Sequence, residues 1–78
     1  DWRRGRALAQ QRVGDFRMRA SDYSGALTAY EESRAILAEL LESDPENTER
    51  QRDLSVSLER KGDALIASGR IAEAETAY

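Results

Sequence analysis

The sequence predicts an all-α fold in which antiparallel helical hairpins stack as an α-solenoid, with about four helices of which the last is truncated. Three observations predict this class. Apolar residues recur at spacings of three and four, and no run of alternating β-branched residues indicates a strand. The linkers between the periodic segments are two to four residues long, so consecutive helices must lie antiparallel. The third observation is an internal repeat.

The repeat has an offset of 48 residues, and eight of the 30 positions that can be compared across it are identical. They are Arg4, Arg12, Gly14, Asp15, Ala26, Thr28, Ala29 and Tyr30, which reappear as Arg52, Arg60, Gly62, Asp63, Ala74, Thr76, Ala77 and Tyr78. Such units cannot bury their apolar faces alone and bury them against one another. We therefore interpret residues 1–78 as one domain, with repeat 1 at about 1–44 and an incomplete repeat 2 at about 45–78.

The first helix is predicted over residues 2–20 and the second over residues 23–43. One apolar stripe on the first helix consists of Trp2, Ala9, Val13, Phe16 and Ala20. The stripe on the second consists of Tyr23, Ala26, Leu27, Tyr30, Ser33, Leu37, Leu40 and Leu41. Asp22 suits the N-cap of the second helix, because its carboxylate can accept hydrogen bonds from free backbone N–H groups in the first turn.

The third helix is predicted over residues 45–67, with Leu54, Leu58, Ala64 and Leu65 among its apolar positions. Asp44 can cap it, Pro45 suits its first position, and Glu46 favours the positive end of the helix dipole. A turn is expected at residues 68–70, and a fourth helix begins near residue 71. Gly69 in this turn can adopt a positive φ angle at little cost.

Two glycines, Gly14 and Gly62, fall inside predicted helices, where glycine costs about 1 kcal/mol relative to alanine. Because both recur at the repeat offset, we expect each to permit the close approach of a neighbouring helix. The opposing small residues are Ala26 and Ala74, and Tyr30 and Tyr78 would fill the space beside each contact.

Composition excludes several functions. The chain has no cysteine and no histidine, which removes disulfides, thiolate metal sites and the commonest general base. We expect no metal and no cofactor. No apolar run is long enough for a membrane span and no signal peptide is visible, so we expect a cytoplasmic protein without membrane contact.

The net charge of −3 is unevenly spread, with +4 in residues 1–19, −7 in residues 20–49 and zero in residues 50–78. We interpret this as a charge-complementary hairpin. The alternative is a basic face for nucleic acid, which the neighbouring acidic segment would screen. No nucleic-acid partner is therefore expected.

These residues resemble a tetratricopeptide repeat. The family pattern has a glycine in its first helix, a Gly-Asp-aromatic turn, an Ala-x3-aromatic pair and a closing Asp-Pro. The matching residues are Gly14, Ser21-Asp22-Tyr23, Ala26-x3-Tyr30 and Asp44-Pro45 in the first unit, and Gly62, Gly69-Arg70-Ile71 and Ala74-x3-Tyr78 in the second. The chain departs from the family's preferred residues at Gln10, Val13 and Arg17, and at Leu58, Lys61 and Leu65.

The period also departs from the family, being 48 residues instead of about 34. The surplus divides into about seven residues per helix, or two helical turns each, which keeps side chains on nearly the same face. The chain thus resembles the long-helix bacterial type of tetratricopeptide repeat.

The resemblance implies a protein-protein interaction or scaffolding module without catalysis, which binds a peptide or partner domain in a concave groove lined by the first helix of each hairpin. The candidate partner-binding residues are Arg4, Leu8, Gln11, Asp15, Met18 and Arg19 in the first unit, and Arg52, Val56, Glu59, Asp63, Ile66 and Ala67 in the second. Their spacing independently traces one stripe on each helix. The alternative is a purely structural role, in which Asp15 pairs with Arg12 or Arg19, and Asp63 with Arg60, as ordinary surface ion pairs.

The groove position that holds Asp15 and Asp63 is an asparagine in many family members that grip a peptide's terminal carboxylate. A carboxylate there would repel that ligand. We therefore expect a preference for basic or donor-rich segments, with Arg4 and Arg52 marking one end of the groove.

A second hypothesis is a homodimerising helical module that is completed by another copy of itself. The fourth helix would have about eight residues, fewer than an isolated helix needs. Both ends of the stack would expose faces that a longer array covers. The chain would then be either a fragment of such an array or a homo-oligomer formed through its exposed repeat ends.

Overall fold

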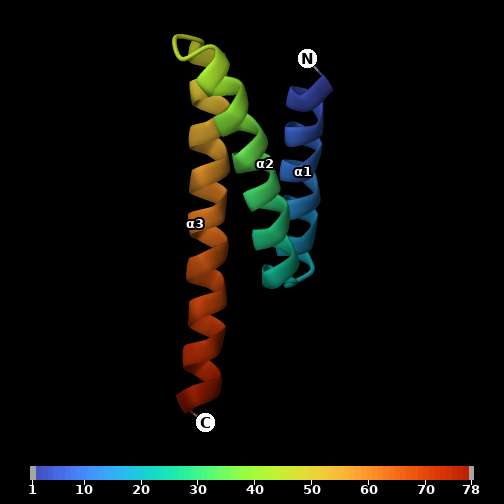
Figure 1. The fold of residues 1–78 in the computed structure, drawn as a ribbon. Coiled ribbons are helices and arrows are strands. Elements are labelled where there is room, and N and C mark those ends of the chain that lie inside the picture. Colours follow the sequence, from blue (N-terminus) through green and yellow to red (C-terminus); the bar gives the residue numbers. More distant parts are fainter. Residues whose placement is uncertain (1, 78) are drawn as a thin grey trace.

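Residues 2–77 form three helices, α1 (Trp2–Arg19), α2 (Tyr23–Ser43) and α3 (Thr48–Ala77), which pack in alternating directions (Figure 1). The computed structural model describes the backbone of residues 2–77 and the side chains of residues 2–69. α2 packs against both α1 and α3 and lies between them in Figure 1, and α3 extends well beyond the turn that joins α1 to α2. The predicted all-α, antiparallel class is confirmed. None of the helices, as far as the structure describes them, is long and apolar enough to cross a membrane.

The turn between α1 and α2 follows the predicted chemistry. Ser21 adopts a left-handed φ of 61°, its N–H donates to the carbonyl of Met18, and the N–H of Asp22 donates to that of Arg17. This pair of bonds is the Schellman arrangement that ends many helices. The Asp22 carboxylate then accepts from the N–H of Gly25 at 3.0 Å. The prediction that Asp22 caps the second helix is therefore confirmed.

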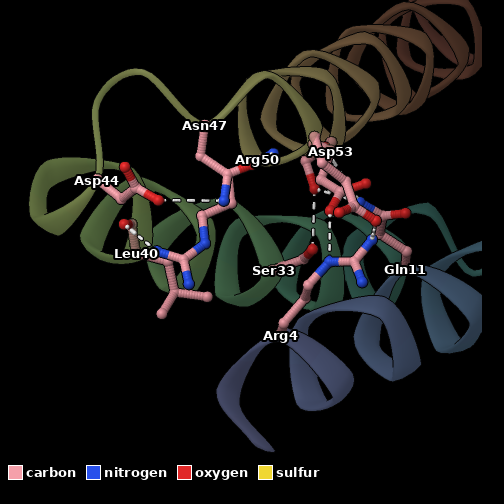
Figure 2. Close-up of polar contacts among 10 residues, drawn as sticks. Arg4, Gln11, Ser33, Leu40, Asp44, Asn47, Arg50 and Asp53 are labelled. Carbon is pink, nitrogen blue, oxygen red and sulfur yellow. Dashed lines mark hydrogen bonds and ion pairs between the residues drawn. The ribbon is translucent and has the colours of Figure 1, made fainter. Parts of the chain in front are cut away.

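The turn between α2 and α3 differs from the prediction, because α3 begins at Thr48 instead of residue 45. The residue that caps it is Asn47, whose side-chain oxygen accepts from the N–H of Arg50 at 3.1 Å. Asp44 instead ends α2, where its N–H donates to the carbonyl of Leu41. The Arg50 guanidinium also donates to the carbonyl of Leu40 at 2.9 Å and so binds one of the carbonyl groups in the last turn of α2 (Figure 2).

The predicted turn at residues 68–70 is absent, and α3 continues as one helix to Ala77. Gly69 does not adopt a positive φ angle. The repeat offset explains the difference, because the residue that corresponds to the capping Asp22 is Arg70, and an arginine side chain has no acceptor for backbone N–H groups. Without a cap, continuing the helix keeps every backbone hydrogen bond.

The expected contact between Gly62 and Ala74 is therefore not formed, because both belong to the same helix and lie about 18 Å apart along its axis. A methyl group on Gly62 would meet no atom within 4 Å. The side chains of Ala74 and Tyr78 lie outside the described residues.

The described side chains form two apolar core clusters. One contains Ala7, Leu37 and Leu40, with Ile36 and Leu54 packed against it; the other contains Ala26, Tyr30 and Ala64, with Met18 and Leu27 packed against it. As predicted, α2 supplies its apolar stripe to both clusters, and its buried residues follow a helical spacing. α2 is the central element of the bundle.

An apolar stripe on a helix ordinarily faces the core, but the stripe predicted on α1 points to solvent. Trp2 is 73% exposed and Phe16 is 70% exposed, and the other three residues of the stripe are exposed as well. The buried residues of α1 are Ala7, Gln11 and Gly14. Small residues on this face let α2 come close, which leaves the large apolar side chains on the outer face.

Glu31 of α2 forms one ionic contact with α3 and a second within α2. Lys61 Nζ donates to Glu31 Oε2 at 2.7 Å, and Arg34 Nη2 donates to Glu31 Oε1 at 2.7 Å. These hydrogen bonds, that from Arg34 first, lower the pKa of Glu31 to about 2. Both basic groups therefore face a carboxylate that stays ionised at ordinary pH.

Candidate functional site

A hollow of about 350 Å³ lies at the C-terminal end of α1, between side chains of all three helices. Its lining consists of Asp15, Met18 and Arg19 from α1, Tyr30 from α2, and Arg60 and Asp63 from α3. Four of these six were candidate groove residues on sequence grounds. They come from both predicted stripes, so the fold brings side chains 48 residues apart in sequence to one place.

The wall of the hollow is built on the Tyr30 ring. This ring lies against Gly14, where a methyl group would come within 2.3–2.8 Å of three ring atoms. The predicted close approach of α2 at Gly14 is thus confirmed, but the nearest group is the Tyr30 ring, which was expected to lie beside a contact between Gly14 and Ala26. The ring is only 2% exposed, so it cannot move aside without opening the core.

Asp15 is held from two sides. The Tyr30 hydroxyl donates to Asp15 Oδ1 at 2.6 Å, and Arg60 Nη1 donates to Asp15 Oδ2 at 2.7 Å. Burial, followed by the contact with Asp15, raises the pKa of Tyr30, so the hydroxyl remains a donor. Asp15 therefore pairs with Arg60 of the other unit, and the alternative pairs with Arg12 and Arg19 are not formed.

The two remaining charges in the hollow have no such partners. Within the described side chains, neither Asp63 nor Arg19 forms a hydrogen bond or an ion pair, and both are exposed. Met18 is half-buried against the apolar cluster that contains Tyr30 and Ala64, and it supplies an apolar surface in the hollow. The hollow thus offers one acceptor, one donor and an apolar surface within a single site.

A buried polar layer lies between the two apolar clusters. Gln11 Nε2 donates to Ser57 Oγ at 2.8 Å, and Ser57 Oγ lies 2.8 Å from Ser33 Oγ, so each helix contributes one member. Gln11 also reaches the carbonyl of Asp53 at 3.4 Å. No buried side-chain nitrogen or oxygen among the described residues lacks a partner. Gln11, a groove candidate, is therefore a buried contact between helices.

Arg4 is also committed to a contact within the chain. It donates to Asp53 at 2.9 Å and to Glu49 at 2.6 Å, and so joins the first turns of α1 to those of α3 (Figure 2). Its hydrogen bond with Asp53, and then the charge of that carboxylate, raises the pKa of Arg4. Both carboxylates lie on α3, so Arg4 joins α1 to α3. Arg60 joins the same two helices through Asp15, nearer the C-terminal end of α1.

The other candidates do not line the hollow. Leu8 and Val56 are half-buried; Arg52, Glu59 and Ile66 are exposed; Ala67 is half-buried. Sequence reasoning did not assign Tyr30 and Arg60 to the site. A signal for them existed, because Gly14, Asp15, Tyr30 and Arg60 all belong to the set that recurs at the offset of 48, and all four meet here.

Across residues 2–69, no group of three or more carboxylate side chains is placed to hold a metal ion. No family model, curated protein or solved structure matches this chain.

Proposed function

We propose that this chain is a tetratricopeptide-type module of the long-helix kind and that the hollow between α1 and α3 binds a peptide or a segment of a partner protein, without catalysis. One observation carries the proposal: residues from the predicted stripes of both units, Asp15 and Met18 on one side and Asp63 on the other, line the same hollow. α1 and α2 act as one hairpin, and α3 packs on it as the first helix of the next unit. This is the arrangement from which an α-solenoid is built.

The free groups in the hollow define the partner's chemistry. Asp15 is already satisfied by Tyr30 and Arg60, so Asp63 is the acceptor that remains for a ligand. A segment that fits would place a lysine, arginine or other donor against Asp63 and an apolar side chain on Met18. The expected preference for basic or donor-rich segments is therefore attributed to a single carboxylate, that of Asp63. Arg4 is occupied by Asp53 and no longer marks an end of the groove.

The proposal is tested with labelled ten-residue peptides that alternate leucine with lysine, glutamine or glutamate, using fluorescence anisotropy to measure Kd. The lysine peptide should bind most tightly. Asp63→Lys should weaken its binding by about tenfold, because reversing a charge replaces an attraction with a repulsion. Asp15 is left unchanged, since replacing it would also break its contacts with Tyr30 and Arg60.

The matched control is Glu39→Lys, which makes the same change of net charge on α2, outside the hollow. It should alter Kd by less than twofold. Equal affinities for the three peptides, or an equal loss in both variants, would show that the hollow does not select a basic segment.

A further inference from the structure

The exposed large apolar side chains of the described residues lie on α1 and α3. Among the described residues they are Trp2, Val13 and Phe16 on α1, and Leu58, Leu65 and Ile66 on α3, each between 40% and 73% exposed. α2, the central helix, contributes none of them. Apolar side chains gathered in this way, on helix faces with nothing packed over them, mark interaction surfaces.

The outer face of α1 also carries a hollow of about 430 Å³, whose lining includes Val13, Phe16 and Arg12. Arg12 forms no hydrogen bond or ion pair with the described side chains and is exposed. The face therefore combines an apolar recess with an arginine at its rim that is available to a partner.

The contact between α1 and α3 shows how residues at these positions are used inside the molecule. There, Arg60 of α3 donates to Asp15 of α1, and Met18 of α1 packs against the cluster that contains Ala64 of α3. An ion pair and an apolar contact, one turn apart along each helix, join the two units.

The repeat offset relates each of these residues to one on an outer face. Arg60 corresponds to Arg12, Asp15 to Asp63, Ala64 to Phe16, and Met18 to Ile66. Arg12 and Phe16 lie on the outer face of α1, and Asp63 and Ile66 are exposed on α3. The two outer faces thus carry the two halves of the contact that the chain already makes once within itself.

We propose that a second copy of this chain docks head to tail, with the outer face of α1 in one copy on the exposed face of α3 in the other. Arg12 would pair with Asp63 and Phe16 would pack on Ile66. In the internal contact Ala26 and Tyr30 of α2 belong to the same apolar cluster as Ala64. Between copies the larger Phe16 takes the place of Ala64.

This interface is heterologous, because different surfaces of the two copies meet, so each added copy leaves one free face of each kind. Association therefore continues beyond a dimer. The interface shares Asp63 with the proposed peptide site but extends beyond it. Phe16 and Ile66 do not line the hollow, so variants at these two positions test the interface and leave the proposed peptide site intact.

The test measures mass in solution by sedimentation for the wild-type chain, Phe16→Arg, Ile66→Arg and their equimolar mixture. The wild-type mass should rise with concentration from the monomer value of 8.8 kDa through dimers to larger species. Each variant alone should stay monomeric, because it lacks one of the two faces. The mixture should form dimers and nothing larger, since one wild-type contact is restored and the remaining two ends carry arginine against arginine.

Charge exchange provides a second measurement. Arg12→Asp and Asp63→Arg should each weaken association by about tenfold, and the double variant should regain it; circular dichroism checks that all remain folded. A wild-type chain that stays monomeric at every concentration overturns the proposal. A mixture in which one variant dimerises with itself while the other stays monomeric also overturns the proposal, because that result indicates a symmetric interface through a single face.

Discussion

Alanine substitutions at Gly14 and Gly62 should have opposite effects on stability, although the two glycines are equivalent in the repeat. At Gly14 the new methyl group would lie 2.3 Å from Tyr30 Cε1, and the buried ring cannot swing away without losing its hydrogen bond to Asp15. Overpacking of this kind costs about 3 kcal/mol at the upper end of its range. Alanine recovers about 1 kcal/mol of helix propensity, so Gly14→Ala should destabilise the fold by about 2 kcal/mol.

At Gly62 no atom lies within 4 Å of the new methyl group, so only the helix propensity changes. Gly62→Ala should therefore stabilise the chain by about 1 kcal/mol. For a domain of this size each kcal/mol moves the melting temperature by about 4–8 °C. Thermal unfolding followed by circular dichroism at low protein concentration should thus show a fall of about 10 °C for Gly14→Ala and a rise of several degrees for Gly62→Ala.

The pair of variants separates two descriptions of the second unit. If residues 71–77 folded back against α3, as the sequence predicts, a methyl group on Gly62 would obstruct the returning helix and both variants would lower the melting temperature. That outcome would refute the continuous α3. A Gly14→Ala protein as stable as the wild type would refute the packing of the Tyr30 ring on Gly14.

Three further predictions concern local contacts, each measured by urea unfolding. Tyr30→Phe should lower the free energy of unfolding by about 1–2 kcal/mol, because Asp15 loses a donor and keeps only Arg60; no loss would mean that the hydroxyl contributes nothing. Ser21→Gly should raise the free energy of unfolding by up to about 1 kcal/mol, because Ser21 has a left-handed φ of 61°, whereas Ser21→Ala should not raise it. Glu31 has its pKa lowered to about 2, so its contribution is complete above the unfolded value near 4.5 and is lost as the pH falls through 2. The stability difference between wild type and Glu31→Gln should therefore be constant from pH 7 to 5 and shrink towards pH 2, and a difference independent of pH would contradict the ionic contact with Arg34 and Lys61.

Features that depend on neighbouring residues in the sequence were predictable. Asp22 follows the end of α1 and precedes the apolar positions of α2, so its capping role could be inferred from order alone. The buried face of α2 was predictable because a central helix contacts neighbours on two sides, so its apolar residues are buried whichever neighbour they face. Gly14 was predictable as a point of close approach because a glycine inside a helix needs a reason in packing.

Features that depend on which helix faces which were not predictable. The stripe on α1 has the spacing of a core face, but α2 packs on the side where Ala7 and Gly14 allow it to come closer. The partner of Asp15 lies 45 residues away, on α3, whereas local spacing suggests Arg12 or Arg19. At residues 68–70 the turn-forming Gly69 was visible, but the absence of an acceptor at Arg70 decided in favour of a continuous helix.

The layer formed by Gln11, Ser33 and Ser57 fixes the alignment of the three helices along their axes. If α1 slid by one helical turn, about 5.4 Å, the Gln11 amide would leave both serines and enter an apolar cluster. An unsatisfied buried amide costs about 1–3 kcal/mol, a large share of the stability of a domain this small. The layer therefore fixes the position of α1 along the bundle, which keeps Asp15 opposite Arg60 and preserves the shape of the hollow.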